Sequence, residues 1–199
     1  MKKGLIALAV AALLILIVGF SVQGTYNDMV AKEETVKQQW AQVENVYQRR
    51  ADLVPNLVAA VQGYAAHERE VLEAVTASRA QVGSMQVTPD ILNRPAEFEK
   101  FQQAQAALSG ALSRLLLVVE RYPDLKANQN FLELQSQLEG AENRIAVERK
   151  RFNEAAQLYN IRIKQFPAVL VARLFGFAEK TYFQSTPGSE KPPVVDFSK

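Results

Sequence analysis

The sequence predicts an all-α protein, in which an N-terminal transmembrane helix precedes an antiparallel up-and-down bundle of long helices. Two observations support this fold class. Residues 4–22 carry no charge, and beyond them apolar residues recur at alternating spacings of three and four. A strand would instead alternate by two, and no useful length of this chain does so.

The uncharged run at the start of the chain is long enough to cross a membrane. At about 1.5 Å per residue, nineteen residues cover most of the roughly 30 Å of a bilayer's hydrocarbon core. The alternative is a cleaved secretory signal, whose apolar core usually has only about 7–15 residues. Its best cleavage site, Val22-Gln23-Gly24, is poor. We therefore expect a short N-terminus at 1–3 and a retained anchor at 4–23.

The charges that flank the anchor predict its orientation. Lys2 and Lys3 precede it, whereas residues 21–31 contain no lysine or arginine. The positive-inside rule places the short N-terminus in the cytoplasm and the body outside it. The predicted location is the bacterial inner membrane, with a single pass.

Composition excludes several classes of function. The chain has 23 basic and 21 acidic residues, so its net charge is too small to create a strong positive electrostatic field that would attract nucleic acid. The absence of cysteine excludes disulfides, thiolate metal sites and cysteine nucleophiles. A single histidine removes most schemes of acid–base or metal catalysis.

The helical bundle is predicted over residues 26–166, and its helix count depends on Pro55. The three-four pattern of apolar residues runs through this proline, which favours three helices with a kink in the first. A break at Pro55 instead gives helices of matched length, so we prefer four. The four expected ranges are 26–53, 56–84, 96–121 and 126–166.

The end of the chain has two expected parts. Residues 167–183 are apolar or amphipathic and too short to span a bilayer. They are predicted to lie near the membrane, either in the lipid interface with Arg173 reaching the headgroups or as a cap on the bundle. Residues 184–199, rich in proline, are predicted to be disordered.

Three charged residues, Arg50, Glu68 and Glu148, fall on the apolar stripes. Buried ionisable groups need partners and can fix the register of packed helices. We favour the simpler interpretation that these side chains lie at exposed edges of the stripes.

The segment that begins His67-Glu68 is the best candidate for catalysis, and it fails. A zinc protease motif needs a second histidine at position 71, which is Val71. A di-iron bundle needs a Glu-x-x-His motif on two helices, but Tyr64 precedes the only histidine by three. We predict no catalytic, cofactor-binding or metal residues.

Several short motifs resemble the LemA family, in the same order from the anchor to about Phe177. They are Tyr26-Asn27, Arg49 to Val58, Gly63 to Glu68, Ala77-Ser78-Arg79, Tyr122 to Leu125, Glu142 to Ile145, Tyr159-Asn160 and Phe166-Pro167. The resemblance implies a bacterial single-pass membrane protein with a helical body, no assigned active site and an uncertain biochemical role. It also implies envelope partners, membrane proteases among them. It places the N-terminus outside the cell, against the charge rule, so orientation stays open.

These observations favour a non-enzymatic, membrane-anchored scaffold or adaptor. Its expected partners are membrane lipid, envelope proteins and further copies of itself, because long apolar stripes suit self-association. The alternative is a lipid- or small-ligand-interacting protein at the membrane surface.

Overall fold

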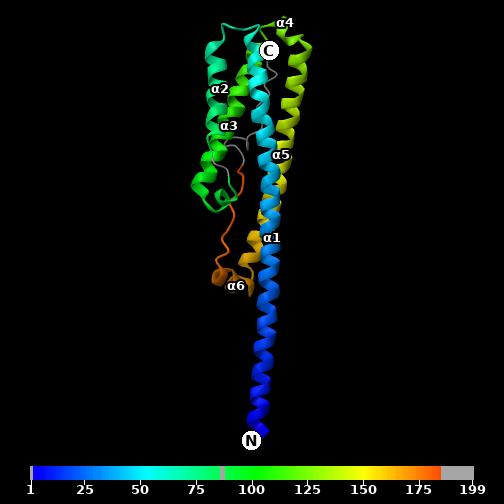
Figure 1. Ribbon diagram of the computed structural model, residues 1–199, viewed down its shortest axis with the longest axis vertical. Helices are drawn as coiled ribbons and strands as arrows, with labels where there is room; N and C mark the ends of the chain where they lie inside the picture. The colour runs from blue at the N-terminus through cyan, green and yellow to red at the C-terminus, as the bar shows by residue number, and fades with distance from the viewer. Residues whose placement is uncertain (1, 86–87, 185–199) are drawn as a thin grey trace, which may run out of the picture.

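The structure, a computed structural model, describes residues 2–85 and 88–184, and its regular elements are all helices (Figure 1). Residues 184–199 were predicted to be disordered, and all but Gln184 lie outside the described residues. The described residues contain no strand, which confirms the all-α prediction. The elements are α1 (Lys2–Gln62), α2 (Arg69–Gly83), η1 (Pro89–Asn93), α3 (Pro95–Val119), α4 (Pro123–Lys126), α5 (Gln129–Lys164) and α6 (Ala168–Phe175).

The four long helices follow an up-and-down course. α1 rises through the body, α2 returns, α3 rises again, and α5 descends along α1 to the short α6 (Figure 1). Two ion pairs show the antiparallel register of α1 and α5, Asp28 with Arg162 and Arg50 with Glu142. α6 therefore lies at the foot of the body, beside α1.

The anchor and the body share one helix. α1 has 61 residues, which corresponds to about 90 Å at 1.5 Å per residue. Its first part exposes large apolar side chains from Leu5 to Phe20, while its buried core positions begin at Met29. Among the described residues, α1 is the one helix that is long and apolar enough to cross a membrane.

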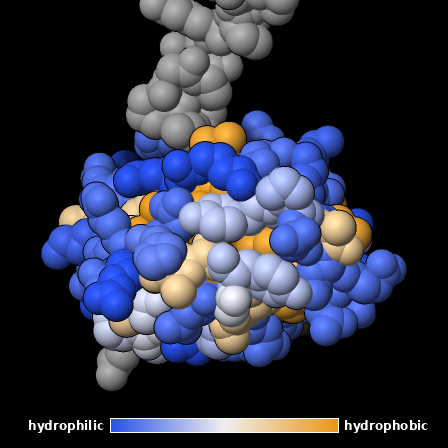
Figure 2. All heavy atoms as spheres, turned by 90° about the horizontal axis from the view of Figure 1, so that it is seen from above, coloured by the Kyte–Doolittle hydropathy of each residue, from blue (hydrophilic) through white to orange (hydrophobic). Residues whose placement is uncertain are grey.

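The body has two apolar clusters. The one nearer the anchor is aromatic, with Trp40 of α1 packed among Phe98, Phe101 and Phe152. The other, nearer the far end, is built mainly from aliphatic residues such as Leu57, Leu108 and Leu115, together with Phe131. The far end presents mostly hydrophilic side chains (Figure 2), as expected for a surface that faces water.

The preferred helix break at Pro55 is wrong. α1 continues through Pro55 to Gln62, and the turn before α2 falls at 63–68. Proline has no N–H, so it leaves the carbonyl of Ala51 without its usual helical donor. In the structure, Arg79 Nε of α2 donates to that carbonyl over 3.4 Å. A side chain from the neighbouring helix thus compensates for part of the cost of proline inside α1.

This compensation makes the effect of Arg79 depend on Pro55. We expect Arg79→Leu to lower the free energy of unfolding by about 1 kcal/mol, the usual net value of one hydrogen bond. In a Pro55→Ala background the restored N–H of residue 55 can bond the Ala51 carbonyl, so the same substitution should cost clearly less. Chemical denaturation of the four variants, followed by circular dichroism, measures the coupling. Equal costs in both backgrounds would contradict this account of Pro55.

Candidate functional site

The three charged residues on the apolar stripes differ in burial and in their partners. Arg50 is 1% exposed, so the preferred interpretation of an exposed edge is wrong for this residue. Glu68 is partly buried and accepts hydrogen bonds from Arg121 and Tyr122, each at 3.0 Å. Glu148 is also partly buried and pairs locally with Arg151 at 2.8 Å. Only Arg50 lies in the middle of the bundle.

Arg50 forms a polar layer with Gln105, Ser109 and Glu142. Its Nη1 donates to Ser109 Oγ at 2.6 Å and to Glu142 Oε1 at 2.8 Å, and its Nη2 donates to Gln105 Oε1 at 2.5 Å. The layer joins α1, α3 and α5 and lies between the two apolar clusters. A shift of one of these helices would leave the buried guanidinium without its partners. We therefore expect the layer to fix the register of α1, α3 and α5.

His67 contributes to no such site. It lies exposed in the turn between α1 and α2 rather than on a helix face. Among the described residues, no group of three or more histidine, aspartate or glutamate side chains is arranged to hold a metal ion.

The second notable site lies where residues 177–184, which we call the strap, cross the lower body. Gly176, with φ 77°, ends α6 in the left-handed conformation, from which the strap runs along α5. A residue with a side chain would be strained there. The strap has no regular secondary structure. It lies in a groove between α1, η1, α3 and α5, and side chains of these elements make most of its polar contacts.

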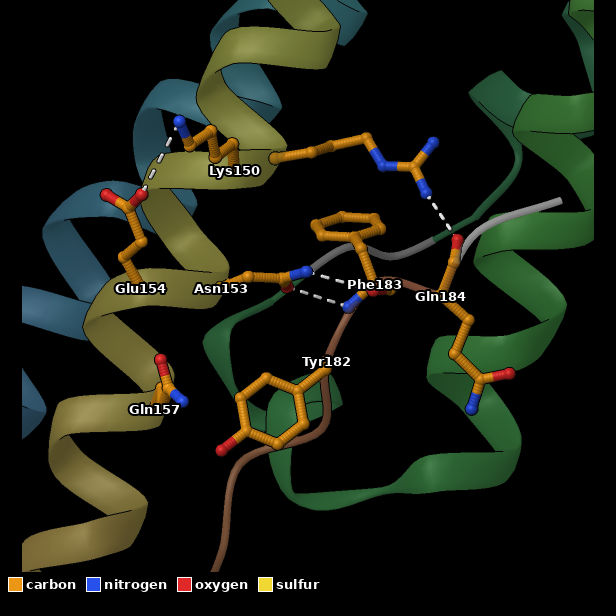
Figure 3. Close-up of a pocket in the computed structure, with 8 residues that line it drawn as sticks. Lys150, Asn153, Glu154, Gln157, Tyr182, Phe183 and Gln184 are labelled. Carbon is orange, nitrogen blue, oxygen red and sulfur yellow. Dashed lines mark hydrogen bonds and ion pairs between the residues drawn. The ribbon is translucent and has the colours of Figure 1, made fainter. Parts of the chain in front are cut away.

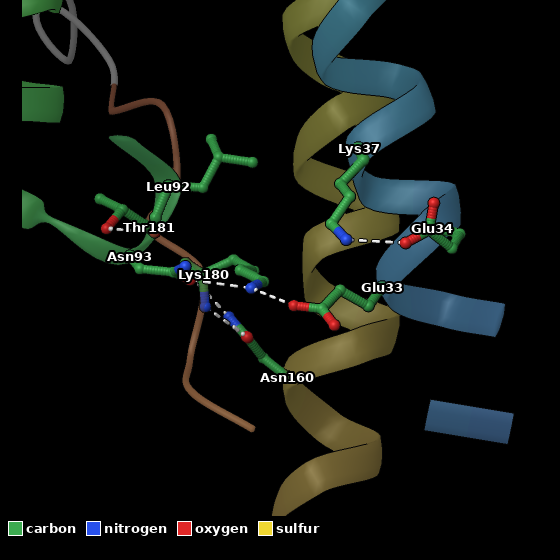
Figure 4. A network of polar contacts seen from close by, with 8 residues as sticks. All are labelled: Glu33, Glu34, Lys37, Leu92, Asn93, Asn160, Lys180 and Thr181. Carbon is green, nitrogen blue, oxygen red and sulfur yellow. Dashed lines mark hydrogen bonds and ion pairs between the residues drawn. The ribbon is translucent and has the colours of Figure 1, made fainter. Parts of the chain in front are cut away.

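Two asparagines of α5 hold the main chain of the strap. Asn153 accepts from the N–H of Phe183 and donates to its carbonyl, both at 2.9 Å (Figure 3). Asn160 makes the same pair of bonds to Lys180, at 2.9 and 2.8 Å (Figure 4). Arg149 donates to the carbonyl of Gln184 at 2.8 Å.

The two held residues of the strap are buried. Lys180 is 5% exposed, and its Nζ donates to Glu33 Oε1 at 2.6 Å and to Asn93 Oδ1 at 2.8 Å. Phe183 enters the aromatic cluster, with ring centroids 4.9 Å from Phe98 and 5.5 Å from Phe152. Burial, together with the Glu33 carboxylate, raises the pKa of Tyr159, whose ring lies beneath the Lys180 ammonium.

Sequence reasoning missed the strap and both asparagines that hold it. A signal was present, since within residues 129–164 an aromatic residue followed by asparagine occurs twice, seven residues apart, as Phe152-Asn153 and Tyr159-Asn160. In each pair the aromatic residue lies on the buried stripe of α5, and the asparagine lies beside it. The partner segment could not be predicted, because it has no periodicity.

α6 carries an exposed apolar face at the foot of the body. Ala168, Val171 and Ala172 are buried against the core. Phe166, Leu170 and Leu174 are 82%, 59% and 76% exposed. The rings of Phe175 and Phe177 contact Tyr26 of α1, just beyond the end of the apolar run. This exposed face therefore lies close to the level at which α1 would leave a bilayer.

In the part of the chain that the structure describes, one apolar helix continues into a helical body, which defines a membrane-associated helical protein of uncertain biochemical role. The chain belongs to the LemA family, whose model matches residues 39–197. This confirms the family resemblance.

Three known proteins are similar to the chain in sequence. It is 28% identical to magnetosome protein MamQ 2 of Paramagnetospirillum magneticum, covering 85% of this chain and 68% of that protein. It is 26% identical to magnetosome protein MamQ of Magnetospirillum gryphiswaldense, covering 98% and 78%. Protein LemA of Metamycoplasma hominis is 23% identical, covering 84% and 72%.

Proposed function

We propose that the protein is a non-enzymatic membrane-anchored scaffold, which holds binding surfaces at a fixed height above the bilayer. The observation that supports this most directly is the continuity of α1, which is both the apolar helix and a central helix of the body. The polar layer and the aromatic cluster join α1 to α5, so the part of α1 inside the body is held by buried contacts, and the apolar helix continues from it without a break.

The proposed partners are envelope proteins, such as membrane proteases, and further copies of the chain. A photo-crosslinking amino acid at Leu117, which is 70% exposed on α3, samples partners of the upper body in native membranes. A variant with a flexible Gly-Ser insertion after Gly24 uncouples the body from the anchor and serves as the comparison. A scaffold should yield specific crosslinked proteins that are lost in the insertion variant. Crosslinks to lipid alone would contradict the proposal.

By the charge rule, we propose that the body lies on the extracytoplasmic side of the inner membrane. Lys150 has a side chain that is 79% exposed and lies on the body. Protease added to spheroplasts should therefore cleave the chain in the body. Cleavage only after the cells are lysed would reverse the orientation.

The exposed face of α6 supports a second function, contact with lipid. A short amphipathic helix can bury its apolar face in the boundary between headgroups and acyl chains. In proteoliposomes containing brominated lipid, we expect a tryptophan placed by Leu174→Trp to be strongly quenched. Leu117→Trp, equally exposed but at the far end, should keep its emission. The native Trp40 is buried and gives a constant background. Equal emission from both variants would exclude an interfacial α6.

A further inference from the structure

The strap groove has the chemistry of a peptide-binding site. Its walls come from α1, η1, α3 and α5. They hold the strap mainly through side chains, and η1 adds one main-chain contact, in which the N–H of Thr181 donates to the carbonyl of Leu92 at 3.2 Å. Asparagine amides that pair with both the N–H and the carbonyl of one residue recognise extended main chain regardless of sequence.

The spacing of these amides matches an extended peptide. Asn153 and Asn160 are seven residues apart on α5, which is about 10.5 Å along the helix. Lys180 and Phe183 are three residues apart, which is about 9.3 Å in a polyproline II chain. The hydrogen bonds show that Lys180 and Phe183 both present their main chain to α5, as an extended chain with a repeat of three residues would. The spacing of the two asparagines along α5 and the spacing of the two held residues along the strap therefore agree to about 1 Å.

The groove also selects side chains at the two held positions. Glu33 and Asn93 bind the lysine, since its ammonium donates a hydrogen bond to both (Figure 4). Trp40, Phe98 and Phe152 pack against the aromatic ring. A hollow of about 570 Å³ adjoins the outer side of the strap, and among residues 2–85 and 88–184 no further element covers the strap there (Figure 3).

We propose that this groove is a binding site for an extended peptide of a partner protein, one that carries a lysine and, three residues later, an aromatic residue. The strap is the resident occupant, and its Lys180 and Phe183 define the ligand. Because the strap is part of the same chain, it competes at a high effective concentration. A partner peptide therefore gains access when the strap is weakened.

The test uses the full-length protein in detergent and a fluorescent peptide with the sequence of residues 178–184. In a Lys180→Ala/Phe183→Ala chain the strap is weakened, and we expect this chain to bind the peptide at least tenfold more tightly than the unchanged chain does. Adding Asn153→Leu and Asn160→Leu should weaken binding at least tenfold again, as should alanine at the phenylalanine of the peptide. Peptide anisotropy and the emission of Trp40, the only tryptophan, report binding.

The opposite result is equally clear. If the weakened chain keeps its helicity but does not raise the anisotropy of the peptide at millimolar concentration, the groove is only an internal packing site. Should the double variant lose helicity, Phe183→Leu weakens the strap more mildly by removing its aromatic ring contacts, and the same two outcomes decide. The measurement uses purified protein and a synthetic peptide, so its result does not depend on whether the protein is a scaffold in cells.

Discussion

Phe152→Ala should lower the free energy of unfolding by about 4 kcal/mol, because it removes a fully buried ring from the centre of the aromatic cluster. The ring lies 5.6 Å from Trp40 and 5.5 Å from Phe183, so its loss leaves a cavity bounded by residues of α1 and the strap. The rings that surround it, Trp40, Phe98 and Phe183, come from α1, α3 and the strap, and their close packing limits how far the cavity can collapse.

Leu158→Ala on the same helix is the matched control. Leu158 is 61% exposed, and its truncation should change stability by no more than about 0.5 kcal/mol. Denaturation in detergent, followed by circular dichroism, compares the two variants. A loss below about 1 kcal/mol for Phe152→Ala would show that the cluster is loosely packed and does not fix the strap.

The helices could be predicted because each buries one stripe, and a stripe is visible within a single segment. The course of the chain at Pro55 could not be decided in this way. The group that compensates for the proline, Arg79, belongs to another helix. Its contact with Ala51 spans 28 residues of sequence, and periodicity contains no information at that range.

The polar layer and the strap show the same limit in different forms. Arg50 was recognised on its stripe, but its burial depends on Glu142, which lies 92 residues away. For the strap, neither its own residues nor the residues that hold it could be found from a pattern of apolar positions. Lysine is normally an exposed residue. Lys180 can be buried because its ammonium donates to Glu33 and its N–H donates to Asn160. Both the polar layer and the strap therefore depend on polar contacts between residues far apart in the sequence. Neither could be predicted from the pattern within one segment.

Glu142→Ala tests whether the polar layer fixes the bundle, and we expect it to lower the free energy of unfolding by about 2–3 kcal/mol. Removing one partner of a buried ion pair leaves an uncompensated charge, which typically costs about 3–5 kcal/mol. We expect a smaller loss than this range because the Glu142 side chain is 39% exposed, and water can therefore reach Arg50 in its place. Glu154→Ala, which breaks the exposed pair with Lys150, should change stability by less than about 0.5 kcal/mol.

Combining Glu142→Ala with Arg50→Met separates the unpaired charge from lost packing. Methionine fills much of the space of the arginine stem without a charge, so the double variant should recover part of the loss. Recovery is incomplete because Gln105 and Ser109 lose the donors that hold them in the layer. Denaturation of the four proteins gives the coupling energy, which we expect to exceed about 1 kcal/mol. A coupling near zero would mean that α1 and α5 keep their register through the apolar clusters alone.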